Sequence, residues 1–322
     1  MFVFLAGRNA TSSLTAASND SLGLFLSQTH LLTSEFSRAE TLFVCLDINR
    51  EAIRHIQNHK IPRNLAILVR NEPEVVCPEN YRSTYLSKFG KVIDVGRPER
   101  PATLTTRWPQ NWPKNLPEAC EGVLQNRSRL VMVNADKLSF IRGEMYSLRR
   151  LSMRALPLDT FGLGWDSSFT KKFKILLGEL QIVLSNKRLP HLPAARGWFS
   201  RARNFKGAVS DKISTMELYR HALVIENDRS FVSEKLFDAL FAGCIPVYVG
   251  ADLKDLNMPP GLVFESPPTI DGLLAAFAKA KEVDFEEWAK LRDSWLAEPT
   301  TFVDNASRNV FQKISDIILE SN

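Results

Sequence analysis

The thirty residues from His221 to Gly250 constrain the fold more than any other stretch of this chain. An apolar run, Ala222 to Ile225, is followed by polar turn-forming residues, which is typical of a buried strand. Ser233 then stands at an N-cap position, apolar residues recur at helical spacing, and Gly243 suits the left-handed residue that ends a helix. A second apolar run, Ile245 to Val249, follows directly. So short a connection between buried strands predicts a right-handed β-α-β unit of a parallel sheet.

The first turn of the predicted helix is a candidate anion site. Its backbone N–H groups point beyond the strand ends, and Lys235 adds a positive charge, which together suit a diphosphate. The adjacent Glu234 could accept hydrogen bonds from ribose hydroxyls. Ordinary helix capping explains the same residues, so the pattern alone leaves both interpretations open.

The order of residues in this unit resembles the donor-binding signature of a known enzyme family. From Glu226 onward the chain follows the pattern EN-x-x-x-F-V-S-E-K-x-x-D-A-x-x-A-G-x-I-P-V-Y-x-G. This is similar to the α-1,3/4-fucosyltransferases, glycosyltransferase family ten, in which F-E-N leads through Y-V/I-T-E-K to a V/I-P-V-x-x-G strand. Two departures leave the bound base and the sugar open: Phe231 replaces the usual tyrosine, and the loop from Asn227 to Glu234 is shorter.

Composition and charge narrow the class of protein. The 322 residues can build two modest domains, and no apolar run of about eighteen residues predicts a membrane-spanning helix. Four scattered cysteines without metal-ligand spacing favour reduced thiols in a cytoplasmic protein. The net charge of +5 is too small for a nucleic-acid binder, but it suits an anionic nucleotide-sugar or an anionic membrane surface.

The first part of the chain alternates strands with helices, which predicts an α/β fold with a parallel sheet. Residues 106–117 carry three prolines and two tryptophans without helical periodicity, and we interpret them as a linker. We therefore expect an N-terminal domain at 1–118 and a donor-binding domain at 119–322 that includes the terminal helices. The apolar stripe from Val310 to Ile318 is expected to be core.

Two arginines in the second domain are candidate donor ligands. A predicted strand, Ser128 to Asn134, precedes a helix from Glu144 to Arg154. In the family that the chain resembles, an arginine of the corresponding helix contacts the donor diphosphate. By register, Arg149 is the first choice and Arg150 the second. The alternative is that both are solvated helix arginines.

Glu72 is the candidate catalytic base. It follows directly on a buried strand, where α/β folds place their ligands. The triplet Asn-Glu-Pro also resembles the family's E-S-P or E-N-E-P acid, near which its proposed base lies. A solvated loop acid is an equally good interpretation. Arg70 occupies the position of a second acid found in some relatives, so that second base would be missing here.

Residues 171–206 are rich in Lys, Arg and Pro, with helical periodicity only from Ile175 to Leu184. Three interpretations are open: a loop over the active site, a membrane-surface patch, or a solvated loop.

The resemblance implies a GT-B architecture, with two Rossmann-like domains facing across a cleft. It implies an inverting glycosyltransferase that moves fucose from GDP-fucose to a hydroxyl of a glycan or glycolipid, as in lipopolysaccharide synthesis, without an obligatory metal. We expect it in the cytoplasm or at the inner membrane face. A transferase for another nucleotide-sugar and a non-catalytic nucleotide- or glycan-binding relative are the alternatives.

Within that mechanism the candidate residues divide into three groups. Arg149 and Lys235 would neutralise the leaving diphosphate, and Glu72 would deprotonate the acceptor. Asn227 and Glu234 would hold the ribose and the sugar. Phe231 would pack against the base or the sugar face.

Overall fold

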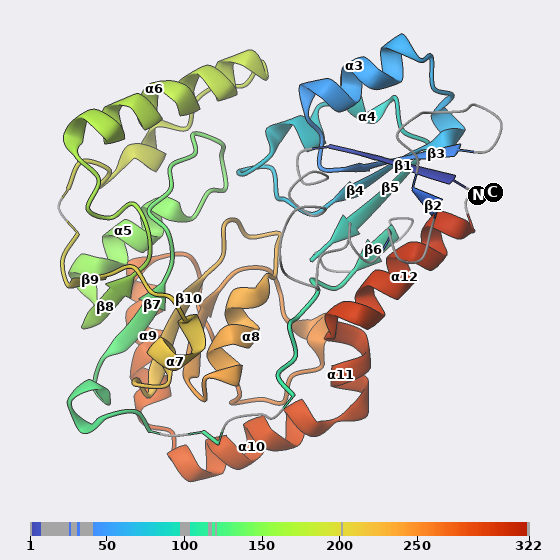
Figure 1. The fold of residues 1–322 in the computed structure, drawn as a ribbon. Helices are drawn as coiled ribbons and strands as arrows, with labels where there is room; N and C mark the ends of the chain where they lie inside the picture. Colours follow the sequence, from blue (N-terminus) through green and yellow to red (C-terminus); the bar gives the residue numbers. More distant parts are fainter. Residues whose placement is uncertain are drawn as a thin grey trace. The chain divides into compact units, whose positions relative to one another are not determined.

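The computed structural model describes residues 2–7, 26, 31–32, 41–96, 104–114, 118–119, 121–200 and 202–320. The chain divides into two compact units (Figure 1). Unit 1 comprises Met1–Trp112 and Phe302–Asn322, and unit 2 comprises Pro113–Thr301.

Unit 1 is built on a parallel sheet with the strand order β2-β1-β3-β4-β5-β6. Its strands are β1 Phe2–Ala6, β2 Leu31–Leu32, β3 Thr41–Leu46, β4 Ala66–Arg70, β5 Lys91–Val95 and β6 Leu104–Thr106. Its helices are α3 Arg50–Asn58, α4 Ser83–Leu86 and α12 Ser307–Leu319, with α11 Pro299–Asn305 at the boundary and short 3₁₀ turns η1 Arg63–Leu65 and η2 Pro78–Tyr81.

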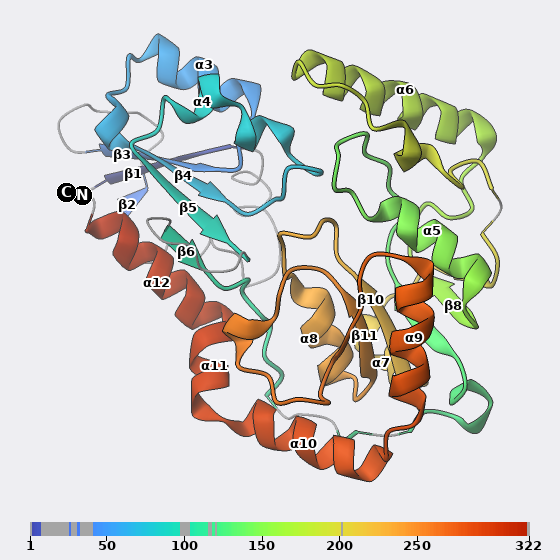
Figure 2. The same cartoon turned by 180° about the vertical axis from the view of Figure 1, so that it is seen from behind.

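Alternate residues of these strands feed two separate cores. Phe43 and Leu68 pack with Ile53 and Ile56 of α3 on one face. On the other face, the strands pack against an apolar stripe of α12 that includes Phe311 and Ile314. Figures 1 and 2 show α3 and α12 on opposite faces of the sheet.

The position of α12 corrects the expected domain division. We expected the terminal helices in the second domain, but α12 buries Val310, Phe311, Ile314 and Ile318 against the strands of unit 1. The stripe is core, as predicted, but it belongs to the sheet at the other end of the chain. Sequence adjacency did not indicate this, because an apolar stripe does not specify which sheet it covers.

Unit 2 contains a second parallel sheet with the order β12-β11-β10-β7-β8-β9. Its strands are β7 Leu130–Val133, β8 Leu158–Phe161, β9 Phe205–Gly207, β10 His221–Ile225, β11 Ile245–Val249 and β12 Phe264–Glu265. Its helices are α5 Tyr146–Ala155, α6 Phe169–Ser185, α7 Lys212–Met216, α8 Glu234–Phe241, α9 Ile270–Lys281 and α10 Phe285–Ala297, with 3₁₀ turns η3 Leu124–Asn126, η4 Leu192–Ala195 and η5 Lys254–Leu256. The predicted α/β class is confirmed. Among the described residues, no helix is both long and apolar enough to cross a bilayer.

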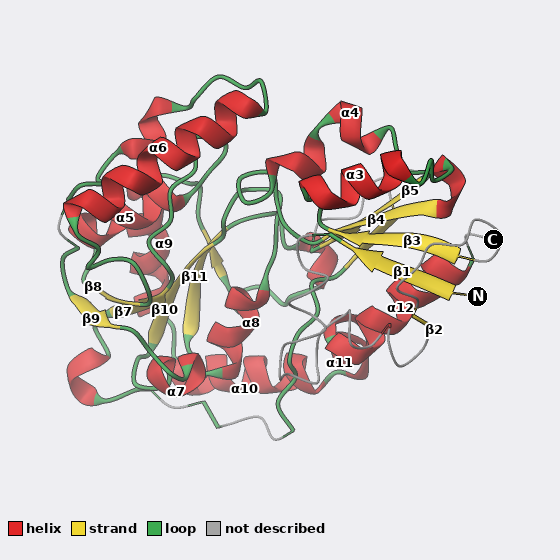
Figure 3. Cartoon of the chain, turned by 45° about the horizontal axis from the view of Figure 1, so that its top comes forward, coloured by secondary structure: helices red, strands yellow, loops and turns green. Residues whose placement is uncertain are grey.

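Helix α6 is longer than its sequence indicated. It has 17 residues, begins after Ser168, whose Oγ accepts from the backbone N–H of Lys171, and lies on the outer side of α5 (Figure 3). Periodicity indicated a helix only from Ile175 to Leu184, because several apolar residues of α6 face solvent and blur the amphipathic pattern. The segment is therefore a helix followed by a basic loop, rather than one long loop.

Candidate functional site

The predicted β-α-β unit is confirmed residue by residue. Strands β10 and β11 are wholly buried and pair in parallel, from His221 opposite Ile245 to Ile225 opposite Val249. Ser233 caps α8, with its Oγ accepting from the backbone N–H of Lys235, and Gly243 has a φ of 71° after the helix. The N-terminus of α8 and the carboxyl end of β10 are thereby brought together at the edge of the sheet that is formed by the carboxyl ends of its strands.

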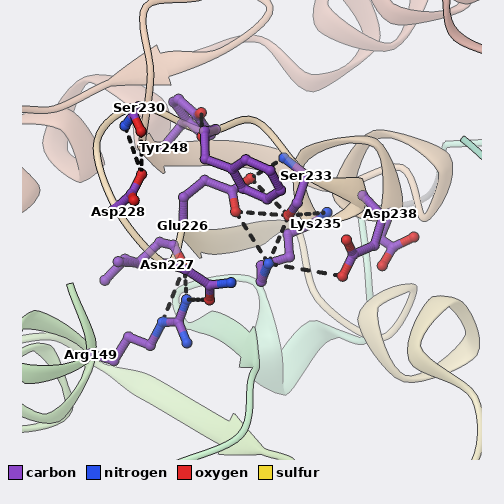
Figure 4. Close-up of polar contacts among 12 residues, drawn as sticks. Arg149, Glu226, Asn227, Asp228, Ser230, Ser233, Lys235, Asp238 and Tyr248 are labelled. Atoms are coloured by element: carbon purple, nitrogen blue, oxygen red, sulfur yellow. Dashed lines mark hydrogen bonds and ion pairs between the residues drawn. The ribbon is translucent and has the colours of Figure 1, made fainter. Parts of the chain in front are cut away.

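Glu226 organises this edge. It follows β10 directly and is 0% exposed, and its carboxylate accepts from the backbone N–H of Ser233 at 2.8 Å and from its hydroxyl at 2.7 Å. Lys235 Nζ completes the set at 3.2 Å (Figure 4). A buried carboxylate with these donors fixes both the first turn of α8 and the position of the lysine.

Glu226 stands in the sequence motif but was not among the predicted site residues. Its position at the end of a buried strand could have indicated a structural role, because a buried carboxylate there needs hydrogen-bond donors from the following loop. Gly250 belongs to the same arrangement: a Cβ there would collide with the Tyr248 hydroxyl and lie 2.8 Å from Glu226 Cγ. The glycine therefore leaves room for the buried carboxylate.

Lys235 is held but not enclosed. Its ammonium donates to Ser233 Oγ at 2.7 Å and to Glu226 Oε2 at 3.2 Å, and it lies 3.9 Å from Glu234 Oε1. Its side chain keeps 16% of its surface exposed. An ammonium has three N–H donors, so one remains for a ligand beyond these two hydrogen bonds.

Arg149 approaches the same edge from α5. Its Nη2 donates to the Ile225 carbonyl at 2.6 Å and to Asn227 Oδ1 at 3.0 Å, and its guanidinium lies over the Tyr146 ring at 4.9 Å. Burial lowers the pKa of Arg149. The side chain is 2% exposed, and within the described residues its Nη1 makes no hydrogen bond, so this group keeps a donor for a ligand. Arg149 and Asn227 are thus brought together at the carboxyl end of β10.

Arg150 faces away from this edge. Its donors bind the carbonyls of Lys137 at 2.7 Å, Ala194 at 2.5 Å and Arg196 at 3.0 Å, and the group lies 3.4 Å from Asp136. Adjacent helix residues point about 100° apart, so both arginines could not face one ligand. Arg150 of α5 therefore holds the loop that follows α6. Arg150 was our second choice for the donor ligand, and the structure corrects that choice.

Phe231 does not present its ring to a ligand. The side chain is 1% exposed and belongs to the core of the loop before α8, and its carbonyl accepts from Ala251 N at 3.4 Å. The expectation that it packs against a base or sugar is therefore not met in this structure. An apolar ring in a short loop fills the interior in preference to facing solvent.

Glu234 lies at the mouth of the site. Its side chain is 36% exposed, and its Oε1 is 3.7 Å from Lys212 Nζ. Burial acts to raise the pKa of this carboxyl, but Lys235 and Lys212 outweigh that effect and lower it. Asp238, one turn further along α8, has its pKa raised to about 6 by burial, against the attraction of Lys212. Glu234 is therefore the charged acceptor at this edge.

Glu72 lies in unit 1, in the loop that follows β4. Its backbone N–H donates to Asp47 Oδ1 at 3.0 Å, and its carbonyl accepts from Asn80 Nδ2 at 3.4 Å. The side chain is half-buried. The buried strand β4 ends at Arg70, so the predicted position of Glu72 just after a buried strand is confirmed. Arg70 pairs with Asp94 at 2.5 Å.

The described part of the chain contains no candidate metal centre, because no three His, Cys, Asp or Glu side chains gather there. Cys45, Cys77 and Cys244 are buried free thiols.

Comparison with known proteins supports the architecture. No family model matches the sequence, and no curated protein matches it significantly. Among solved structures, an α1,3-fucosyltransferase with GDP-fucose has a TM-score of 0.53 at 15% identity, covering 99% of this chain and 90% of that one. HepE (Alr3699) of Anabaena with UDP has a TM-score of 0.51 at 12% identity, covering 99% of both chains.

An α-glucosyltransferase in complex with UDP and a 13-mer DNA with a central A:G mismatch is also similar, with a TM-score of 0.51 at 9% identity, covering 99% of this chain and 100% of that one. The chain has the GT-B fold. Two α/β units, each with a parallel sheet, were predicted from the sequence and are confirmed. At identities of 9 to 15%, these likenesses establish the fold of the chain and not its donor.

Proposed function

We propose that this protein is a metal-independent, inverting fucosyltransferase that transfers fucose from GDP-fucose to a hydroxyl of a glycan or glycolipid. The observation that carries the proposal is the cluster at the carboxyl end of β10. There Arg149, Asn227 and Lys235 come together around the buried Glu226 (Figure 4). The same residues carry the sequence resemblance to family ten.

The cluster has the chemistry that a departing nucleoside diphosphate requires. As the glycosidic bond to the diphosphate breaks, negative charge accumulates on the phosphate oxygens. The free Nη1 group of Arg149 and the third donor of Lys235 would neutralise that charge. They would take the place that a divalent cation holds in other transferases.

Glu234 and Asn227 are assigned to the ribose and the sugar. The pKa of Glu234 is lowered because the effect of two lysines exceeds that of burial, so it would accept hydrogen bonds from hydroxyls as a carboxylate. Asn227 would use the amide group that does not bind Arg149.

Glu72 is assigned the role of general base. Its place after β4, at the carboxyl edge of the sheet of unit 1, supports this assignment. It would take the proton of the acceptor hydroxyl as that oxygen attacks the anomeric carbon from the face opposite to the diphosphate. General base catalysis contributes about 10²- to 10⁴-fold to such rates.

Calorimetric titration with GDP, UDP and CDP in the presence of chelator tests the donor assignment. We expect GDP to bind most tightly, and Arg149→Ala and Lys235→Ala to weaken it. Each lost charge-assisted contact corresponds to about tenfold or more in Kd. Lys279→Ala, at an exposed lysine of α9, is the matched control. A preference for UDP would favour a GT-B transferase with another nucleotide-sugar, as the UDP complexes of similar structures also suggest.

Lys235→Ala leaves Glu226 buried without its cation and could unfold the protein, so a loss of GDP binding needs a second variant to interpret it. The pair Glu226→Gln/Lys235→Met removes both charges and keeps the volume. If this variant is folded and still binds GDP as the wild type does, the lysine is not a donor ligand.

Transfer from GDP-fucose to a panel of oligosaccharides then tests Glu72. We expect Glu72→Gln to lower kcat by about 10²- to 10⁴-fold and to leave GDP affinity unchanged. Tight GDP binding without transfer to any acceptor, in wild type and variant alike, would support the non-catalytic alternative.

A further inference from the structure

A row of exposed apolar side chains runs along α6. Phe169, Phe173, Leu177 and Leu184 are 68, 46, 51 and 59% exposed. Their spacing of four, four and seven residues places them on one face of the helix. Phe199, from the loop after α6, adds a ring whose centroid lies 4.9 Å from that of Phe169. We call these five residues the α6 face.

Buried contacts prevent this face from turning inward. Lys172, on another side of α6, donates to Asp136 Oδ2 and to the Trp198 carbonyl, each at 2.9 Å. The indole of Trp198 donates back to the Lys172 carbonyl at 3.0 Å. Because Lys172 and Asp136 are both buried, rotation of the helix would leave an unpaired charge in the interior. The apolar row is therefore held outward by the fold.

The segment that carries the α6 face is strongly basic. Residues 169–206 contain nine lysines and arginines and one acid, Glu179. This net charge of +8 exceeds the +5 of the whole chain, so the remaining residues are acidic overall. Lys171, Lys174 and Lys187 are exposed on α6 or just after it. Contiguous apolar surface of this kind marks an interaction site.

We propose that the α6 face docks on an anionic lipid bilayer. The phenylalanines and leucines would enter the boundary between headgroups and acyl chains, and the lysines would bind lipid phosphates, as in amphipathic helices that lie in the membrane plane. The positive charge of the segment favours this occupant over an uncharged apolar protein surface, which would give the lysines no partner. The inference does not depend on the identity of the donor.

Co-sedimentation of the full chain with vesicles tests the proposal. We expect binding to vesicles of equal parts phosphatidylglycerol and phosphatidylcholine, little binding to pure phosphatidylcholine, and a loss of binding as salt is added. Phe173→Ser/Leu177→Ser should lower the partition coefficient by about tenfold or more, because two apolar anchors are lost. Lys174→Glu/Lys187→Glu should lower it similarly at low salt and less at high salt.

Two matched variants serve as controls. Leu274→Ser changes a leucine of α9 that is 42% exposed, and Lys290→Glu changes an exposed lysine of α10. Both should bind vesicles as the wild type does. All four variants change exposed positions, so their urea midpoints and GDP affinity should match those of the wild type.

Other results would overturn the proposal. Absence of vesicle binding would do so, as would equal binding to both kinds of vesicle or an equal loss in the controls. Light scattering adds a further outcome. If the wild type is a dimer that Phe173→Ser/Leu177→Ser dissociates, and vesicles are not bound, the face is a contact between two copies of the chain.

Discussion

β3 of unit 1 and β10 of unit 2 hold the same third place in their sheets, and each is followed by a fully buried carboxylate. Asp47 follows β3, and Glu226 follows β10. In both units the carboxylate accepts hydrogen bonds from backbone N–H groups of a segment further along the chain. The remaining hydrogen-bond donors of Asp47 and Glu226 differ.

Asp47 Oδ1 is bound by three neutral donors, the backbone N–H groups of Asn71 and Glu72 and the amide of Asn80, at 2.9, 3.0 and 2.5 Å. Burial raises the pKa of Asp47, although these hydrogen bonds act to lower it. Glu226 is bound instead by Ser233 and by the ammonium of Lys235. The same position after a central strand therefore shapes a loop in unit 1 and places a cation in unit 2, because the hydrogen-bond donors around it differ.

The largest effect is expected from removing the carboxylate of unit 2. Glu226→Ala leaves Lys235 and the Ser233 N–H without their acceptor, so the free energy of unfolding should fall by about 3 kcal/mol. Urea unfolding at pH 7 measures it. Glu265→Ala, at an exposed glutamate, should change little. If Glu226→Ala is as stable as this control, the ion pair does not hold the first turn of α8.

The two strands also differ at their beginnings, which predicts an acid sensitivity in unit 2. β10 begins with His221 and β3 with the neutral Thr41. Burial is the main cause that lowers the pKa of His221 to about 4. The unfolded chain therefore binds more protons between pH 6.5 and 4, so stability is retained above pH 6.5 and lost as pH falls through this window, by about 3 kcal/mol.

Urea unfolding at pH 7 and pH 4.5 measures this slope in the wild type and in His221→Leu. The variant should lose less stability on acidification than the wild type. An equal loss in both would show that His221 is not the group responsible.

The smallest effect is expected from Asp47→Asn. An amide keeps the acceptor and tolerates the φ of 56° at this position, so stability at pH 7 should stay within about 1 kcal/mol of the wild type. Asp47→Ala leaves three donors without an acceptor and should lose about 2 kcal/mol. Urea unfolding distinguishes the two variants.

The stability of Asp47→Asn should also depend on pH differently from that of the wild type. Because the folded-state pKa of Asp47 is raised, the wild type loses stability as pH rises from about 4 through that pKa. The asparagine variant lacks this loss, so it should gain on the wild type between pH 4 and pH 7. A constant difference would contradict the raised pKa.

Local patterns predicted the elements of the site well. Ser233 as the cap of α8, Gly243 after it and the buried runs on either side were all readable, because capping, left-handed turns and apolar periodicity depend on neighbouring residues. The placement of Glu72 after β4 has the same origin. The resemblance ranked Arg149 before Arg150, and in the structure Arg149 contacts Asn227 whereas Arg150 binds the Lys137 carbonyl.

Four features were decided by contacts between distant residues. α12 joins the sheet of unit 1, Arg150 turns to the loop after α6, Phe231 enters the core, and α6 extends with an exposed apolar face.

The α/β class, the β10-α8-β11 unit and the residues at the N-terminus of α8 could therefore be predicted from the sequence, because these follow from spacing along the chain. Only the tertiary structure decided which sheet α12 covers, which arginine meets Asn227 and which apolar residues stay exposed. The physical reason is that an apolar or charged side chain specifies the kind of partner that it needs, whereas the folded backbone determines which partner is within reach.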